Sequence, residues 1–171
     1  SAGKFIPVDD AEKIWDFENQ DLTYAKKNGK IGFIDLKGNW VILPIYDKAK
    51  AFYKNLAPVC VGSKWGYINP KADFIIPPTY SDAEVFGSNG LAPVKEKNWG
   101  FINEAGKLVI PTQYGITSNG FVIALFVQQD KGFIDGLARV KNEGKWGFLK
   151  PDGTVLGNQW FENAELFSQT S

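Results

Sequence analysis

The side chains best suited to acid–base chemistry in this sequence are five scattered aspartates, Asp35, Asp47, Asp73, Asp82 and Asp152. Most of them fall in predicted turns, where aspartate is favoured because its carboxylate accepts hydrogen bonds from nearby backbone N–H groups. Their spacing gives neither a calcium-binding loop nor a pair of carboxylates set for general acid–base catalysis. No glycine-rich phosphate loop opens a helix. The sequence therefore predicts no catalytic residue, no metal site and no cofactor.

The chain has no histidine and a single cysteine, Cys60, so an internal disulfide is excluded. A reactive thiol needs a neighbouring histidine or a cationic pocket that lowers its pKa. We therefore expect an unreactive thiol at Cys60 and a protein that is not an enzyme. A hydrolase whose carboxylates converge from separate turns is the enzymatic alternative, and it requires two or three of them in one cleft.

One six-residue pattern recurs along the chain and must organise its fold. It reads Lys64-Trp65-Gly66-Tyr67-Ile68-Asn69, it returns at residues 98–103 and 145–150, and weaker copies lie at 30–35 and 130–135. The shared glycines are separated by 34, 34, 32 and 15 residues, at Gly32, Gly66, Gly100, Gly132 and Gly147. An internal period of this length indicates a repeat architecture.

Each complete repeat is predicted to hold an apolar strand, the Trp-Gly strand, a return strand and a short closing segment. We divide a single domain of residues 1–171 into a half repeat at 5–17 and repeats at 21–52, 55–86, 90–119, 120–135 and 136–167. Within the half repeat, Asp10-Ala11-Glu12 is aligned with Asp82-Ala83-Glu84.

The fourth repeat, 120–135, is truncated, because the last glycine step is 15 residues rather than 34, a shortfall of 19. Either a return segment was deleted in evolution, or about 19 residues are absent between Asp135 and Gly136. We favour the second interpretation, because a repeat without a return strand would leave backbone edges unpaired.

Alternation along the Trp-Gly strand puts Trp65 and Tyr67 on one face and Gly66 and Ile68 on the other, so both faces are apolar and should be buried. A glycine is expected where another backbone or an aromatic ring comes close. The fold predicted is all-β, with tandem hairpin-based repeats stacked as an elongated array; a propeller of about five blades is the alternative. The structural repeat positions are Gly32, Trp65, Gly66, Trp99, Gly100, Gly132, Trp146 and Gly147.

The return strands and closing segments also keep a register. Trp40, Phe74, Leu108 and Val155 share one position, Tyr46, Tyr80, Tyr114 and Phe161 share a second, and Phe52, Phe86 and Phe167 share a third. Two tryptophans, Trp15 and Trp160, fall outside this register. Terminal repeats of an array are atypical because they cap its core, so we expect these two rings to be caps, with a platform for sugar or peptide as the alternative.

The overall charge is balanced, since lysine plus arginine equals aspartate plus glutamate at 19 each. This balance predicts neither nucleic-acid binding nor attraction to an anionic membrane. No apolar run approaches the roughly 18 residues that a membrane-spanning helix needs, so no membrane span is expected.

The stretch from Gly90 to Pro111 contains Gly-Leu-Ala-Pro-Val-Lys, Trp-Gly-Phe-Ile-Asn and Gly-Lys-Leu-Val-Ile-Pro. It resembles the WG, or KWG, repeat of bacterial proteins, and the resemblance extends over about residues 5–167. The chain departs from that pattern at Ile31 and Lys131, which replace the tryptophan. The resemblance implies an all-β repeat domain without transferable catalytic residues, and it leaves the compartment open, with an exported or envelope protein favoured over a cytoplasmic one.

Together these observations predict a non-enzymatic module that binds or scaffolds a protein or peptide. The alternative is a module that binds carbohydrate or cell wall through Trp15 and Trp160. Exposure of both rings would favour this alternative, and deep burial of both would remove it.

Overall fold

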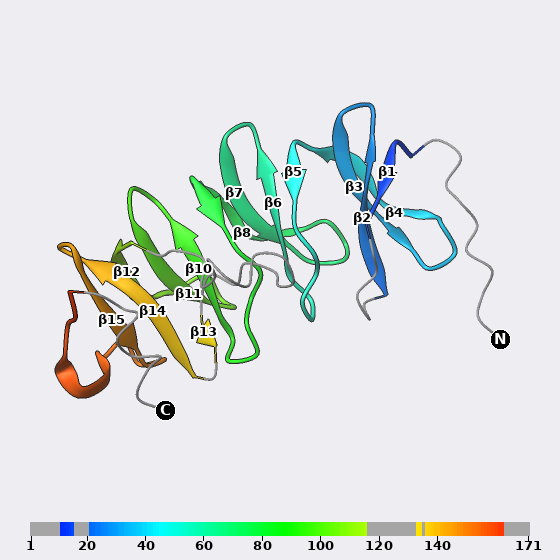
Figure 1. Ribbon diagram of the computed structural model, residues 1–171. Helices are drawn as coiled ribbons and strands as arrows, with labels where there is room; N and C mark the ends of the chain where they lie inside the picture. Colours follow the sequence, from blue (N-terminus) through cyan, green and yellow to red (C-terminus); the bar gives the residue numbers. More distant parts are fainter. Residues whose placement is uncertain (1–10, 16–20, 116–132, 135, 163–171) are drawn as a thin grey trace. The chain divides into compact units, whose positions relative to one another are not determined.

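The computed structural model describes residues 11–15, 21–115, 133–134 and 136–162 (Figure 1). Within these residues the regular structure consists of short antiparallel strands and one 3-10 turn, η1 (Leu156–Asn158), which confirms the all-β class. The strands form small hairpin sheets, and no sheet within the described ranges closes into a barrel. The contacts divide the chain into two compact units, residues 1–85 and 86–171, which are described separately.

The N-terminal unit contains two four-stranded sheets with the same plan. The first has the order β1-β2-β3-β4 and the second the order β5-β6-β7-β8. In each, a two-residue strand from one closing segment pairs with the first strand of the next repeat, so a sheet spans the boundary between repeats. The strands are β1 (Lys13–Ile14), β2 (Leu22–Lys27), β3 (Lys30–Asp35), β4 (Trp40–Tyr46), β5 (Lys48–Ala49), β6 (Ala57–Val61), β7 (Lys64–Ile68), β8 (Phe74–Tyr80) and β9 (Asp82–Ala83).

The C-terminal unit contains the three antiparallel strands of the third repeat and a second small sheet, of order β13-β14-β15. Residues 116–132 and 135 are not described, so most of the predicted fourth repeat, including Lys131 and Gly132, lies outside the described residues. The strands are β10 (Leu91–Lys95), β11 (Trp99–Asn103), β12 (Leu108–Tyr114), β13 (Phe133–Ile134), β14 (Leu137–Asn142) and β15 (Lys145–Leu149).

The Trp-Gly strands are buried on both faces, as their two apolar faces predict. In β7, all four residues from Trp65 to Ile68 are buried, and the same holds for Trp99 to Ile102 in β11. The tryptophan side chains are only 7% exposed at Trp65 and 6% at Trp99. These two rings are therefore core residues of their repeats.

The predicted register between strands is confirmed at two of its three positions. Trp40, Phe74, Leu108 and Val155 all lie opposite the last apolar residue of the Trp-Gly strand. Tyr46, Tyr80, Tyr114 and Phe161 all lie opposite its first residue. The third position includes Phe167, which lies outside the described residues; Phe52 and Phe86 at this position are buried.

Each described return strand carries a bulge over the shared glycine. Between the pairs Ile31↔Tyr46 and Phe33↔Ile42, β3 advances by two residues while β4 advances by four. A methyl group at Gly32 would overlap the carbonyl oxygen of Ile42 and stand 2.7 Å from the carbonyl carbon of Leu43. Gly66 and Gly100 are covered by β8 and β12 in the same way. A glycine is required here because the backbone of the return strand crosses directly over it.

The fifth repeat covers its glycine differently. Beyond β15 the chain makes bridges from Leu149 to Val155 and from Trp146 to Phe161, with η1 between them instead of a continuous return strand. A methyl group at Gly147 would stand 2.8 Å from two ring carbons of Trp160. The sequence predicted either a backbone or an aromatic ring next to the shared glycine. A backbone lies there at Gly32, Gly66 and Gly100, and an aromatic ring at Gly147.

Candidate binding surfaces

The aspartates identified in the sequence mainly accept hydrogen bonds from nearby residues. The carboxylate of Asp35 accepts the backbone N–H groups of Lys37 and Asn39, both at 2.9 Å, and these bonds hold the pKa of Asp35 below its usual value. The pKa of Asp152 is lowered likewise by hydrogen bonds from Thr154. Each of these two carboxylates closes the turn in which it lies.

Asp47 and Asp73 are also used locally. Asp47 pairs with Lys30 and accepts the backbone N–H of Gly62 at 2.7 Å, and the hydrogen bond from Lys30 is the main cause of its lowered pKa. The side-chain amide of Asn69 donates to the carboxylate of Asp73 at 3.4 Å. Among the described residues, no three His, Cys, Asp or Glu side chains gather where they could hold a metal ion.

Two carboxylates do meet, and they meet on a lysine. Lys50 Nζ lies 3.3 Å from a carboxylate oxygen of Asp82 and 3.0 Å from one of Glu84, and it donates to the carbonyl oxygen of Ala83 at 2.8 Å. The same ammonium group lies 4.9 Å from the ring centroid of Trp65. These four contacts pair the half-exposed ammonium group of Lys50 and link the closing segment that contains Lys50 to the one that contains Asp82 and Glu84. We call this cluster the Lys50 latch.

The thiol of Cys60 is buried, and its burial raises its pKa. A raised pKa keeps the thiol protonated, and the thiolate is the nucleophilic form. The structure thus gives Cys60 the properties of a packed, unreactive side chain.

The two tryptophans predicted as caps or platforms occupy different environments. Trp160 is half-buried and packs, like Val155, against the core cluster of the C-terminal unit; its ring stacks on that of Tyr114, with centroids 6.3 Å apart and 19° between the planes. Because its ring also fills the space above Gly147, Trp160 performs the packing role of a return strand.

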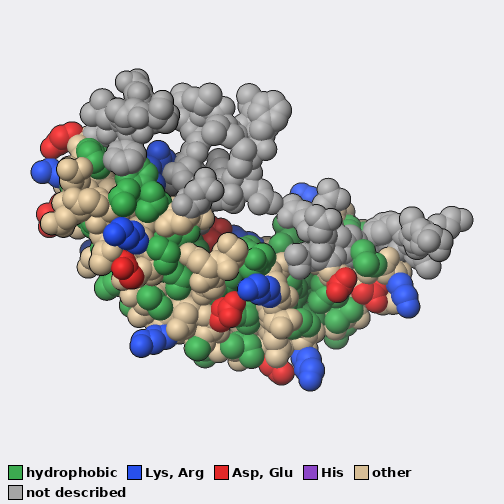
Figure 2. Space-filling model, turned by 90° about the horizontal axis from the view of Figure 1, so that it is seen from below, with side chains coloured by type: hydrophobic (Ala, Val, Ile, Leu, Met, Phe, Trp, Pro, Cys, Tyr) green, Lys and Arg blue, Asp and Glu red, His purple; other side chains and the backbone are tan. Residues whose placement is uncertain are grey.

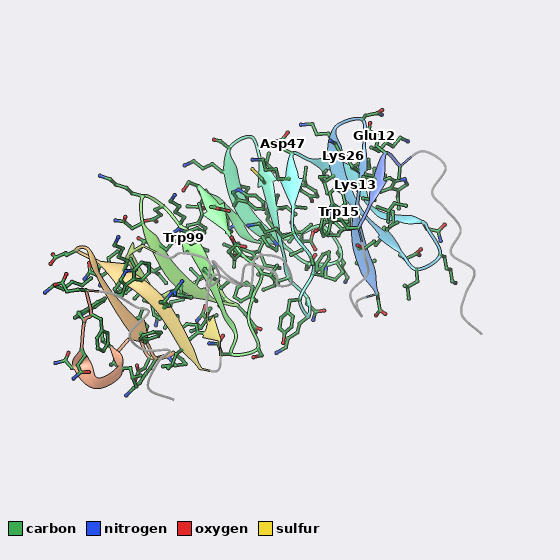
Figure 3. All side chains as sticks on the ribbon, viewed as in Figure 1. Glu12, Lys13, Trp15, Lys26, Asp47 and Trp99 are labelled. Atoms are coloured by element: carbon green, nitrogen blue, oxygen red, sulfur yellow. The ribbon has the colours of Figure 1, made fainter. Side chains whose placement is uncertain are left out.

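Trp15 is half-buried beside the first strand of the first repeat, where Figure 3 labels it with Glu12, Lys13 and Lys26. Its ring stacks on that of Tyr24, with ring centroids 4.5 Å apart and 27° between the planes. Its backbone N–H donates to the carbonyl of Tyr24 at 3.2 Å, and its own carbonyl accepts the hydroxyl of Thr23 at 2.8 Å. The backbone hydrogen bonds between Trp15 and β2 thus fix the position of the Trp15 ring beside Tyr24.

The register also corrects the alignment of the half repeat. Lys13 and Ile14 pair with Lys26 and Ala25, as Lys48 and Ala49 pair with Cys60 and Val59 in the next sheet. The hydrogen bond from the Trp15 N–H therefore corresponds to the one from Lys50 to Pro58, at 3.0 Å. Trp15 occupies the position of Lys50 and Glu84, and the alignment of Asp10-Ala11-Glu12 with Asp82-Ala83-Glu84 is wrong by three residues.

A second exposed surface, not predicted from the sequence, lies on β4. The side chains of Val41, Leu43 and Ile45 are 47%, 66% and 60% exposed. They alternate with the buried Ile42 and with Tyr46, so they share the outer face of the strand. The signal was available in the sequence, because the corresponding residues of β8 are Ile75, Pro77 and Thr79 and those of β12 are Val109, Pro111 and Gln113.

Charged side chains of both signs are interspersed with hydrophobic ones over the face shown in Figure 2, in agreement with the balanced charge. Among the helices of the described residues, none is long and apolar enough to cross a membrane.

A family model for the WG containing repeat matches the chain at residues 31–65, 65–98, 99–115 and 131–146, which together make up more than half of its length. The last match begins at Lys131 and ends at Trp146, one residue before Gly147. No curated protein sequence matches the chain. The first three matches cover β3 with β4, β7 with β8, and β11 with β12, and the chain belongs to the family of proteins with WG containing repeats.

Proposed function

We propose that this chain is a non-enzymatic module that binds or scaffolds a protein or peptide, and that β4 is the strand that receives it. The observation that carries the proposal is the difference between β4 and the other return strands. β4 presents three exposed apolar side chains at alternate positions, and it has Leu43 where β8 and β12 have proline, its own proline being Pro44.

The backbone of β4 offers hydrogen-bonding groups along this edge. β4 is the last strand in the order β1-β2-β3-β4, and the carbonyl of Ile42 lies toward β3, above Gly32. Because β4 ends this sheet, no strand of the sheet pairs with its other edge among the described residues. Proline at the positions equivalent to Leu43, Pro77 and Pro111, has no N–H to donate.

Proline is one of the devices that protect an edge strand against pairing with another chain. β8 and β12 have proline directly after the isoleucine that pairs with the Trp-Gly strand, whereas β4 has Leu43 there and its bulge proline, Pro44, one residue later. An extended peptide added beside β4 would gain main-chain hydrogen bonds from the edge and apolar contacts from the alternating side chains.

The experiment converts β4 into the sequence of its neighbour. Leu43→Pro together with Ile45→Thr gives the bulge residues of β8, which the fold already accepts in that place. A displayed library of random twelve-residue peptides is selected against the wild-type protein, and the enriched peptides are then measured against the variant.

We expect enriched peptides with apolar residues at alternate positions, and an affinity at least about tenfold lower for the variant, because both hydrogen bonds and apolar contacts are lost. The melting temperature should stay within a few degrees of the wild type. As the control, Thr79→Val on β8 should leave peptide affinity unchanged. Equal binding of the selected peptides by the variant would contradict the assignment to β4.

A further inference from the structure

We infer that the stacked pair Trp15 and Tyr24, with Lys13 and Lys26, forms a binding site for an acidic saccharide, meaning a sugar ring that carries a carboxylate. This site lies on β1 and β2 and is separate from the edge of β4. Three observations on this part of the N-terminal unit lead to it.

The first repeat departs from its neighbour at two positions that touch each other. Trp15 stands where the next closing segment has Lys50, and Tyr24 stands where β6 has Pro58, as the strand pairing shows. At both positions the first sheet has an aromatic residue where the second has a non-aromatic one, and the centroids of the two rings are 4.5 Å apart. In the second sheet Lys50 is used for ion pairs with Asp82 and Glu84, whereas the corresponding residue of the first sheet, Trp15, is part of an aromatic pair.

The aromatic pair is anchored from within and half-exposed outside. Tyr24 contacts Phe33 edge-on at 6.4 Å, and Phe33 contacts the buried Phe52 at 4.7 Å. Trp15, at the outer end of this series of rings, keeps part of its surface in solvent. A preorganised ring of this kind presents apolar contact area at low entropic cost.

Two cations border the pair, and no salt bridge joins either of them to an acid within the described residues. Lys13 and Lys26 lie directly opposite each other on β1 and β2, an arrangement in which like charges repel. Lys13 Nζ lies 4.5 Å from the ring centroid of Trp15. Among the described residues the neighbouring acid is Glu12, which precedes β1 and whose backbone N–H donates to the carbonyl of Lys26 at 2.7 Å.

These features specify the ligand by its chemistry. A carboxylate placed between Lys13 and Lys26 would relieve their repulsion and gain two charge-assisted hydrogen bonds. A sugar ring bearing that carboxylate would set its C–H face against the indole. Single-stranded nucleic acid fits less well, because it is bound by successive stacking rings along a basic track, and here one aromatic pair stands in a chain of zero net charge.

The test is isothermal titration calorimetry of the whole chain with oligogalacturonate, in parallel with a neutral cello-oligosaccharide and a single-stranded oligonucleotide. We expect binding of oligogalacturonate that weakens as salt is added. Trp15→Ala should reduce affinity by about tenfold or more, through loss of stacking. Lys13→Gln with Lys26→Gln should reduce it similarly and remove most of its salt dependence, while Trp15→Phe should retain most of the affinity.

Lys48→Gln serves as the matched control, because Lys48 holds the position of Lys13 in the next sheet but lies opposite the neutral Cys60. It should bind as the wild type does. Equal affinity for the neutral saccharide would overturn the role of the lysines, and tighter binding of the oligonucleotide would overturn the saccharide class. Absence of saccharide binding, or binding unchanged by Trp15→Ala in a variant with wild-type melting, would overturn the site.

Discussion

The third and fifth repeats carry the same Trp-Gly pair and cover its glycine by different means. In the third repeat the backbone of β12 crosses over Gly100, and Trp99 is buried beneath it. In the fifth repeat the ring of Trp160 lies over Gly147, and Trp146 is only half-buried. The guanidinium carbon of Arg139 and Nζ of Lys141 lie 5.2 and 5.4 Å from the Trp146 ring.

The difference shows what the glycine contributes. Both repeats need an empty position beside the tryptophan, but one fills the space with main chain and the other with a side chain. A main-chain cover is fixed by the hydrogen bonds of the strand, whereas an aromatic side chain can shift by rotating about its own bonds. The third repeat should therefore tolerate change at these positions much less than the fifth.

The largest difference is expected for the tryptophans. Trp99→Ala removes a ring that is 6% exposed and should lower the free energy of unfolding by about 3–5 kcal/mol, as for large core aromatics. Trp146→Ala should cost roughly half as much, because a half-exposed ring loses less buried apolar surface. Urea unfolding followed by circular dichroism measures both, and equal costs would show that the two rings are equally part of the core.

The glycines test the two covers directly. Gly100→Ala places a methyl group against the backbone of Ile110 and Pro111 and should cost about 3 kcal/mol or more, since a strand backbone cannot move aside. Gly147→Ala meets only the ring of Trp160 and should cost about 1–2 kcal/mol.

A double mutant isolates the contact at Gly147. In a Trp160→Ala background the added methyl group has no ring to displace, so the further effect of Gly147→Ala should fall to a few tenths of a kcal/mol. A cost that persists in this background would mean that something other than Trp160 restricts the position.

Much of this fold follows from the spacing of the residues. The positions of Trp40 and Tyr46 opposite the Trp-Gly strand, with those of their counterparts, could be assigned because a period of 34 repeats each position several times. The need for glycine could be deduced because strand alternation puts Gly66 on an apolar face. The carboxylates could be assigned to turns because aspartate makes local hydrogen bonds there.

Other features could not be predicted because they depend on the pairing of two strands rather than on the sequence of one. The two-residue bulge depends on pairing between β3 and β4, which apolar alternation alone does not reveal. The position of Trp15 depends on hydrogen bonds to β2, and matching the letters Asp-Ala-Glu gave a shift of three residues. The Lys50 latch left a signal that was missed: Lys48 and Lys50 lie one period before the acidic Asp82 and Glu84.

The smallest predicted effect concerns the turn after the Trp-Gly strand, which is closed by Asp35 in the first repeat and by an asparagine in the second and third. Asn69 accepts the backbone N–H groups of Lys71 and Asp73 at 2.9 and 3.0 Å, the pattern that Asp35 makes with its own turn. Asp35→Asn should therefore change the free energy of unfolding at pH 7 by no more than about 0.5 kcal/mol.

Aspartate and asparagine in this turn should differ in their effect on stability at acidic pH. The pKa of Asp35 is lower in the folded protein than its usual value, so the stabilisation from its carboxylate is complete above the unfolded pKa and is lost as pH falls through the folded pKa. Asp35→Asn should thus lose less stability than the wild type when urea unfolding is measured below about pH 4. The reciprocal change, Asn69→Asp, should add acid sensitivity to the second turn. If both variants keep the wild-type pH profile, the turn hydrogen bonds do not couple to stability, and asparagine and aspartate are interchangeable there at any pH.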